Sequence, residues 1–461
     1  MLEKLSNIFR IPDLRKRILF TLGLLAVYRL GGHIPTPGVN ADRLQQFFEQ
    51  NRGSFLGFVD LFSGGQLRRL TIFALGIMPY ITASIILQLL TVVYEPLAKL
   101  QKEGEMGRKK ITQWTRYLTV LLSAVQSMGI ALSLEKSGDF VVNPGVGFIL
   151  MTMLTLTTGS AFIMWLGEQI TERGVGNGMS LLIFAGIVVG LPRGVADLLD
   201  KVRTDAWGVF TAPAMILLVG IMVLIVAFIV YVERSERRIP VQYAKRVVGR
   251  KVMGGQSTHL PLRVNAGGVM PVIFASSILT MPQMLFQGFK NNRYFGDLLR
   301  ALGWGEPLYT LLYALGIIFF AYFYVSIVFN PNEVADNMRK YGGFIPGIRP
   351  GKRTADHINE ILTRITLVGA LYLIIISFIP EWMITGIHLN HLWGPIGAFF
   401  ERLPTWMTNG LGVTFYFGGT SLLIVVGVAM DTVTQVEAQL IMRHYDGFTP
   451  RSGRIRGRRV W

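Results

Sequence analysis

Histidine and cysteine, which often carry nucleophilic, acid–base and metal chemistry, are scarce in this sequence. The chain has 6 histidines and no cysteine, so thiol catalysis, thiolate metal sites and disulfides are excluded. His388 and His391 could share one face of a helix, but exposure to solvent explains this pair better, and no HExxH spacing occurs. We therefore expect no catalytic activity, no metal site and no cofactor.

The sequence GVGNG, from Gly174 to Gly178, has enough glycine to be compared with a nucleotide-binding loop. It follows a predicted helix instead of a strand, and it lacks the GxGxxG spacing of a phosphate-binding turn. We interpret it as a tight turn between two helices.

Long apolar runs dominate the chain and must position any functional side chain. Of its 461 residues, 51% are hydrophobic and 16% are charged, against roughly 25% charged residues in ordinary soluble proteins. The runs that are candidates for crossing a bilayer lie at residues 18–33, 71–94, 117–134, 146–167, 178–192, 211–232, 266–288, 308–330, 365–380 and 410–430. We predict an all-α integral membrane protein with ten transmembrane helices.

The positive charges are distributed unevenly between the connections of these runs. Connections on the side of the N-terminus hold 32 Lys and Arg residues, and those on the opposite side hold 12. The positive-inside rule therefore places both termini in the cytoplasm. Ten helices also allow two pseudo-symmetric five-helix halves around a central pore. We assign residues 1–192 to the N-terminal half, 193–430 to the C-terminal half and 431–461 to a basic cytoplasmic tail.

Ionisable residues are nearly absent from the ten runs. Arg29 lies near the end of the first run, and Asp431 directly follows the last. An ion-coupled transporter would be expected to keep a carboxylate, a histidine or a lysine at mid-membrane. A multi-span solute transporter is therefore the weaker alternative to a channel. A membrane-embedded enzyme is disfavoured because no convergent set of nucleophile, acid or metal ligands is present.

The stretch from Asp60 to Tyr94 has two parts that require different surroundings. From Thr71 to Tyr94 there is no charged residue, and about 24 residues at roughly 1.5 Å each cross an apolar core of about 30 Å. The preceding part is amphipathic and includes Ser63, Gly64, Gly65, Arg68 and Arg69. Such a piece is tolerated at membrane depth only in a wet cavity lined by protein. The pattern therefore indicates a pore with a separate element inside it.

Two connections on the predicted cytoplasmic side are much longer than a turn requires. Residues 233–263 contain two strand-like stretches, and residues 331–364 contain a tip rich in proline and glycine. Their basic side chains could orient the protein and attract anionic lipid. They could instead contact a large anionic partner such as ribosomal RNA or an acidic face of a motor protein. The second interpretation is favoured because 8 basic residues on one hairpin exceed what orientation needs.

Four segments carry a more specific likeness. They read ALGIMPYITASIILQLL (residues 74–90), QSTHLPLRVNAGGVMPVIFASSI (256–278), GIRPGKRTADHI (347–358) and FGGTSLLIVVGVAMD (417–431). Together they resemble the bacterial SecY family, the channel subunits of the protein translocon, along essentially the whole chain. The resemblance implies a channel that passes unfolded secretory polypeptides across the bacterial cytoplasmic (inner) membrane and inserts membrane proteins laterally into it. It implies as partners SecE-like and SecG-like membrane subunits, a SecA-type ATPase motor, the ribosome and anionic lipids.

The resemblance also implies a pore ring of aliphatic side chains. Such a ring is physically suited to a channel, because branched apolar groups exclude water and ions and yield around a passing chain. The ring falls on Ile77, Ile81, Ile183, Ile273 and Ile424. Ile77 and Ile81 are at i and i+4 and share a helical face, and Pro79 between them is expected to bend the helix.

The segment from about Leu56 to Leu70 matches the plug half-helix of the family, which closes the outer side of the ring. Its named residues are Ser63, Gly64, Gly65, Arg68 and Arg69. Thr82, Gln126 and Asn265 match polar positions of a lateral gate between the second and third helices and the seventh and eighth. Hydrogen bonds across that seam would each favour closure by about 1 kcal/mol.

Docking of the motor and the ribosome is implied for the two long connections. Arg349 in GIRPG matches an arginine of one docking loop, and Lys245, Arg246, Arg250 and Lys251 lie in the other. Asn332 and the long segment 387–408 depart from the pattern of the family.

Overall fold

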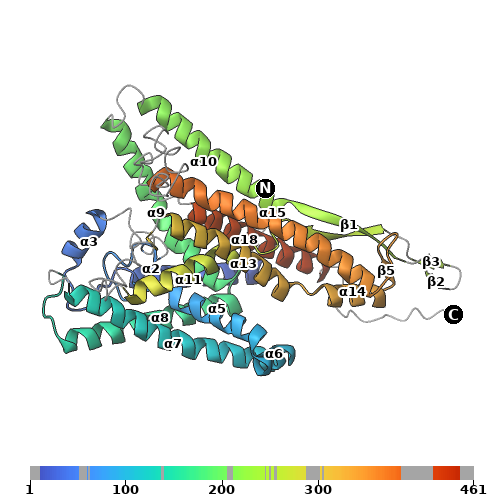
Figure 1. The fold of residues 1–461 in the computed structure, drawn as a ribbon, viewed down its shortest axis with the longest axis horizontal. Helices are drawn as coiled ribbons and strands as arrows, with labels where there is room; N and C mark the ends of the chain where they lie inside the picture. The colour runs from blue at the N-terminus through green and yellow to red at the C-terminus, as the bar shows by residue number, and fades with distance from the viewer. Residues whose placement is uncertain are drawn as a thin grey trace, which may run out of the picture.

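The structure is a computed structural model, and it describes residues 11–50, 60, 63–136, 140–204, 211–243, 246–248, 251–253, 257–286, 302–303, 306–385 and 419–446. It is built mainly from long helices that pack side by side, with a slender β-hairpin extending from one end of the bundle (Figure 1).

The helices are α2 (Pro12–Gly31), α3 (Ala41–Gln50), α5 (Met78–Val93), α6 (Glu95–Lys102), α7 (Glu105–Lys136), α8 (Val146–Arg173), α9 (Gly178–Arg203), α10 (Thr211–Arg234), α11 (Met270–Phe286), α13 (Pro307–Val328), α14 (Pro331–Lys340), α15 (Lys352–Thr385) and α18 (Gly419–Asp446). The strands are β1 (Glu236–Tyr243), β2 (Arg246–Val248), β3 (Lys251–Met253), β4 (Ser257–Arg263) and β5 (Gly343–Phe344). Each of the ten predicted runs overlaps one of these helices.

Six segments of the described residues are long and apolar enough to cross a bilayer. They lie at Glu105–Glu135, Val146–Arg173, Gly178–Ala196, Pro307–Lys340, Lys352–Ile379 and Ser421–Leu440. The pair α5 and α6, bent by 105°, would add a seventh, and α11 is shorter. The chain is therefore a multi-pass membrane protein by length and composition, and the full count of ten stays a prediction.

The run predicted as one helix from Thr71 to Tyr94 is helical only from Met78 onward. Residues 71–77 form turns, with Gly76 at φ +56°. Pro79 occupies the first turn of α5 and Ile77 caps it. The expected bend at Pro79 is thus wrong. The first turn of a helix leaves its N–H groups without a partner in the helix, so a proline, which has no N–H, is well suited to this position and begins the helix instead of bending it.

The close approach of helices around residues 71–77 depends on glycine. A Cβ on Gly159 of α8 would lie 1.8 Å from the carbonyl oxygen of Ile72, and one on Gly31 of α2 would collide with the ring of Phe73. The turns are therefore held between α2 and α8.

The GVGNG segment forms a short turn between α8 and α9, which confirms the prediction of a helix-to-helix turn. A Cβ on Gly178 would lie 1.9 Å from the carbonyl oxygen of Gly167, so glycine permits the contact. From this turn α9 continues through Pro192 to Arg203. The predicted boundary after residue 192 therefore lies inside a helix.

The two long connections form one structural unit at the end of the bundle. β1 pairs antiparallel with β4, with Glu236 opposite Arg263, and also with β5, with Gln242 opposite Phe344. Ile239 and Val241 of β1 are buried in a small core that also contains Met338 of α14 and Ile358 of α15. The strand-like stretches predicted in residues 233–263 are confirmed, and the hairpin is anchored to the second connection.

Candidate functional site

A cavity of about 420 Å³ opens among α5, α7, α8, α9, α11 and α13. Its lining combines apolar and polar side chains. The residues that line it are Tyr80, Ile81, Ser84, Gln88, Thr112, Arg116, Glu168, Thr171, Glu172, Asn177, Met179, Ser180, Ile183, Met270, Ile273, Phe274 and Tyr324. We call Ile81, Ile183 and Ile273 its floor and Arg116, Glu168 and Glu172 its charged wall.

The floor belongs to the largest apolar core of the described structure. The five predicted ring residues, Ile77, Ile81, Ile183, Ile273 and Ile424, all lie in this one cluster and are between 0% and 7% exposed. They come from the start of α5 and from α9, α11 and α18, which are far apart in the sequence. The fold therefore brings the predicted ring residues together.

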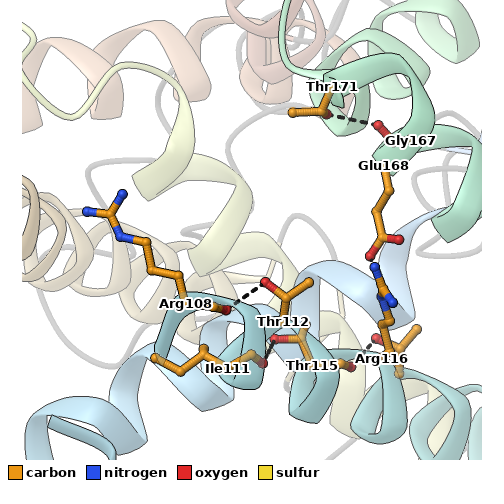
Figure 2. Close-up of polar contacts among 9 residues, drawn as sticks. Arg108, Ile111, Thr112, Thr115, Arg116, Gly167, Glu168 and Thr171 are labelled. Atoms are coloured by element: carbon orange, nitrogen blue, oxygen red, sulfur yellow. Dashed lines mark hydrogen bonds and ion pairs between the residues drawn. The ribbon is translucent and has the colours of Figure 1, made fainter. Parts of the chain in front are cut away.

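The charged wall was missed by the sequence reasoning. Nε of Arg116 on α7 lies 2.8 Å from Oε1 of Glu168 on α8, and the two side chains point toward one another (Figure 2). The apolar runs were bounded at residues 117 and 167, directly beside these two charges, whereas α7 begins at Glu105 and α8 continues to Arg173. Opposite charges at the facing ends of consecutive runs were the signal that could have indicated the pair.

The threonines near the wall donate hydrogen bonds within their own helices. Thr112 Oγ1 donates to the carbonyl of Arg108 at 3.0 Å, and Thr171 Oγ1 donates to that of Gly167 at 2.9 Å (Figure 2). Thr171 Oγ1 also accepts a hydrogen bond from the backbone N–H of Gly178, the first residue of α9, at 2.9 Å. Among the contacts drawn in Figure 2, the Arg116–Glu168 pair joins α7 to α8.

The predicted plug is described at residue 60 and from Ser63 onward; the rest of the segment from Leu56 lies outside the described residues. Asp60 and Ser63 are helical, but Gly64 to Leu70 form turns, so the predicted half-helix does not extend to Leu70. Gly64 and Gly65 have φ values of +71° and +80°, which favour glycine and end the helix.

An internal ion pair stabilises this turn. The backbone N–H of Arg68 donates to Oδ1 of Asp60 at 3.0 Å, and its Nε lies 3.8 Å from Oδ2. Burial raises the pKa of the Asp60 carboxyl, and the Arg68 charge opposes that rise. Ser63 Oγ donates to the carbonyl of Asp60, while Arg69 is half-buried.

The plug segment contacts the helices around it. Nη1 of Arg29 on α2 donates to the carbonyl oxygen of Gly64 at 3.2 Å. A Cβ on Gly64 would lie 2.8 Å from Cα of Gly186 on α9, the helix that also carries Ile183 of the floor. At its other end, the backbone N–H of Thr36 donates to the carbonyl of Leu70 at 2.8 Å.

The predicted gate helices meet, since α5 and α7 both contact α11. The expected hydrogen bonds across this seam are not formed by two of the three polar residues. Thr82 Oγ1 donates to the carbonyl of Met78 in its own helix. Asn265 precedes α11, and its Nδ2 donates to Glu233 Oε1 at 2.7 Å and to the carbonyl of Gly268. Gln126 is 2% exposed, and its Oε1 has no hydrogen-bond partner within the described structure.

The docking residues are described in part. Arg349 is exposed, and its carbonyl oxygen accepts a hydrogen bond from Thr354 Oγ1 at 2.9 Å. Arg246 and Lys251 belong to the paired strands β2 and β3. Lys245, Arg250 and the segment 387–408 lie outside the described residues.

Comparison with solved structures defines the class of fold as that of a protein-conducting membrane channel. A structure described as "The structure of a protein conducting channel" matches with a TM-score of 0.63 and 17% sequence identity, covering 94% of each chain. Canine Sec61 in a ribosome-channel complex matches with a TM-score of 0.59 and 16% identity, also over 94% of each chain. At these identities the likeness concerns the fold.

Sequence comparison then identifies the family. The sequence model of the SecY family matches residues 71–433. The protein translocase subunit SecY of Escherichia coli (strain K12) is 48% identical over 441 residues, which are 94% of this chain and 93% of the relative. The SecY subunit of Streptomyces griseus is 45% identical, with 97% and 100% covered. The chain belongs to the SecY family.

Proposed function

We propose that this chain is the channel through which unfolded polypeptides cross the membrane, with the pore passing through the floor of the cavity. The observation that carries the proposal is the meeting of five buried isoleucines from four helices in one core, three of which line a cavity with a polar wall. Branched apolar side chains offer an ion no ligand, so a ring of them remains dry while empty and deforms around a passing chain.

The seam of α5 and α7 against α11 is the proposed lateral exit for apolar segments. Its polar residues contribute little to closure, because Thr82 and Asn265 are bonded elsewhere. Interhelical hydrogen bonds in membranes contribute only about 0.6 to 2 kcal/mol each, so packing must supply most of the closing free energy. A sufficiently apolar client segment can replace that packing with contacts of its own.

The turn from Asp60 to Leu70 is the proposed plug, and it closes the pore on the side opposite the cavity. Its contacts with α2 and with Gly186 of α9 place it against two helices of the N-terminal half. The Asp60–Arg68 pair keeps its backbone compact, so the plug would leave the pore as a unit.

The hairpin β1–β4 and the loop carrying Arg349 form the proposed docking surface for a SecA-type motor and the ribosome. The shared core of Ile239, Met338 and Ile358 supports this role, since it makes the two connections one rigid support. We further propose SecE-like and SecG-like subunits and anionic lipids as partners, a bacterial cytoplasmic membrane as the location, and both termini on the cytoplasmic side.

The pore is tested by ion conductance. The triple change Ile81→Gly, Ile183→Gly and Ile424→Gly, in the complex reconstituted in a bilayer, should raise the resting conductance, because water can enter the widened ring. Ile229→Gly is the matched control: Ile229 of α10 is buried in the same core but is not one of the five predicted ring residues. Equal conductance of the triple variant and the unmutated complex would contradict an apolar seal at these positions.

Docking is tested separately at Arg349. Arg349→Glu should abolish motor-driven translocation, because the substitution reverses the charge that faces the partner. The complex should assemble normally, because the side chain of Arg349 is exposed. Undiminished export by this variant would refute the assignment.

A further inference from the structure

The wall of the cavity holds more negative than positive charge. Of the charged residues that line it, Arg116 is the cation, and Glu168 and Glu172 are the carboxylates. The two glutamates are at i and i+4 on α8, so they lie on the same face of that helix. Arg116 pairs with Glu168, and Glu172 interacts with the same guanidinium only electrostatically.

The two partners of the ion pair differ in exposure. The Glu168 side chain is 14% exposed and the Arg116 side chain is 44% exposed. A carboxylate that is largely buried requires a cation nearby, because an unpaired one is strongly destabilising. The half-exposed guanidinium can turn into water at little cost. Glu168 is thus the fixed member of the pair and Arg116 the exchangeable one.

The floor and the wall share one cavity, so a client that crosses the floor passes the wall. A client with an apolar segment at Ile81, Ile183 and Ile273 would place its neighbouring residues beside Glu168 and Glu172. Apolar segments of membrane proteins carry Lys and Arg on their cytoplasmic flank. The sequence of this chain has the same pattern, with Arg15, Lys16 and Arg17 directly before its first apolar run.

We propose that Glu168 and Glu172 bind the Lys or Arg that flanks the apolar segment of an arriving client, and that Arg116 occupies Glu168 while no client is present. The inference rests on the proposed function of the cavity as the channel. The exchange replaces one charge-assisted hydrogen bond with another, so Glu168 is never left without a cation.

The exchange has a consequence for the seam. α7 contacts α5 and α11 on the side of the seam, and the Arg116–Glu168 pair joins it to α8. When a client cation takes the place of Arg116, α7 loses this ionic contact. Binding of the flank would therefore loosen one helix of the lateral gate as the apolar segment reaches the floor.

The test compares two clients that differ only in their flank. One secretory polypeptide is made with three lysines before its apolar segment, and a second with three glutamines. Both are translocated by the full chain assembled with its partner subunits and carrying Glu168→Gln together with Glu172→Gln. Transport of the lysine client should fall at least about fivefold, within the range of a charge-assisted hydrogen bond. Transport of the glutamine client should fall much less than that of the lysine client, and its remaining transport also shows that the variant is folded.

A matched control is Glu360→Gln. Glu360 pairs with Arg364 four residues away on α15, on an exposed surface away from the cavity lining. This change should affect neither client.

Crosslinking provides a readout that does not depend on transport. Because the chain has no cysteine, Thr112→Cys introduces a unique thiol on the cavity lining. A stalled lysine client with one cysteine in its flank should form a disulfide there, and the yield should fall in the double glutamine variant and rise in Arg116→Gln, which frees Glu168.

The outcomes separate the two proposals. An equal loss for both clients would mean that the pair only fastens α7 to α8, and this would overturn the charge proposal, as would no loss for either client. Failure of the unmutated complex to transport any client would instead contradict the channel function itself.

Discussion

The floor and the wall of the cavity are a few side chains apart, yet they work by opposite physical means. The floor consists of aliphatic groups that are almost completely buried and belong to a large core. The wall consists of charges held by one specific contact between two helices. An apolar ring blocks the passage of ions because it offers them no ligand. A charged wall acts only through the partner that it selects.

Because of this difference, one channel can accept polypeptides of any sequence at its seal and still distinguish clients by their charge at its wall. A seal must accept every polypeptide, so its side chains should be interchangeable with others of similar shape. A recognition site must distinguish clients, so the sign of each charge matters. Changes in the floor should therefore affect ion leak, and changes in the wall should affect client preference.

The largest effect is expected from a polar group in the floor. Ile273→Asn should raise resting ion conductance by about tenfold or more, because an amide in the ring retains water and removes the dewetting barrier. Single-channel recording in a planar bilayer measures it. Ile273→Val keeps the apolar character and should conduct as the unmutated chain does; if both substitutions leak equally, shape and not polarity seals the pore.

A smaller effect is expected from the plug. Arg68→Met leaves the buried Asp60 carboxylate without its ionic partner, and breaking a buried pair in this way costs about 3–5 kcal/mol. Backbone hydrogen exchange at residues 60–77 should accelerate. Arg69→Met, at a half-buried arginine next to it, is the control and should change exchange much less.

The same variant predicts a pH dependence. Because burial raises the pKa of Asp60 in the folded chain, the folded state binds this proton more tightly than the unfolded state. The contribution of the Asp60 carboxyl to the stability of the plug is therefore full at low pH, and it is lost as the pH rises through the raised pKa. In Arg68→Met, protection from exchange should recover on acidification, since a neutral carboxyl needs no counter-charge. Protection that falls on acidification would contradict this interpretation of Asp60.

Gly64→Ala tests the contact between the plug and α9. The added Cβ would lie 2.8 Å from Gly186 Cα at a φ of +71°, and such local strain costs about 1–3 kcal/mol. Thermal stability of the complex and exchange protection of the plug should both decrease. Gly23→Ala in α2 meets no atom within 4 Å and has no positive φ, so it should be neutral or slightly stabilising.

The smallest effect on conductance is expected from the wall. Arg116→Gln should change resting ion conductance by less than about twofold, because the dry ring and not the wall limits ion passage. A large leak in this variant would erase the distinction between floor and wall. Such a leak would mean that the Arg116–Glu168 ion pair contributes to the seal of the channel.

The sequence by itself determined the membrane class, most of the helices in the described residues and the turn between α8 and α9. Uncharged runs must be helical in a bilayer because every backbone group needs an internal partner, and α7, α8, α9, α10 and α15 cover their predicted runs. The turn from Gly174 to Gly178 and the strands of the hairpin follow from local rules on glycine and alternation. The ring residues came from the family likeness, since one isoleucine in an apolar helix does not differ locally from another.

Only the tertiary structure decided which side chains meet. Arg116 and Glu168 are 52 residues apart, and each lay just outside an apolar run, so local pattern could not pair them. Asn265 bonds to Glu233 and not across the seam, because the chain turns back from β4 before α11 begins. The turns at residues 71–77 replaced a predicted helix because α2 and α8 close around them. Periodicity reports the burial of one element, whereas contacts between elements depend on how all of them pack.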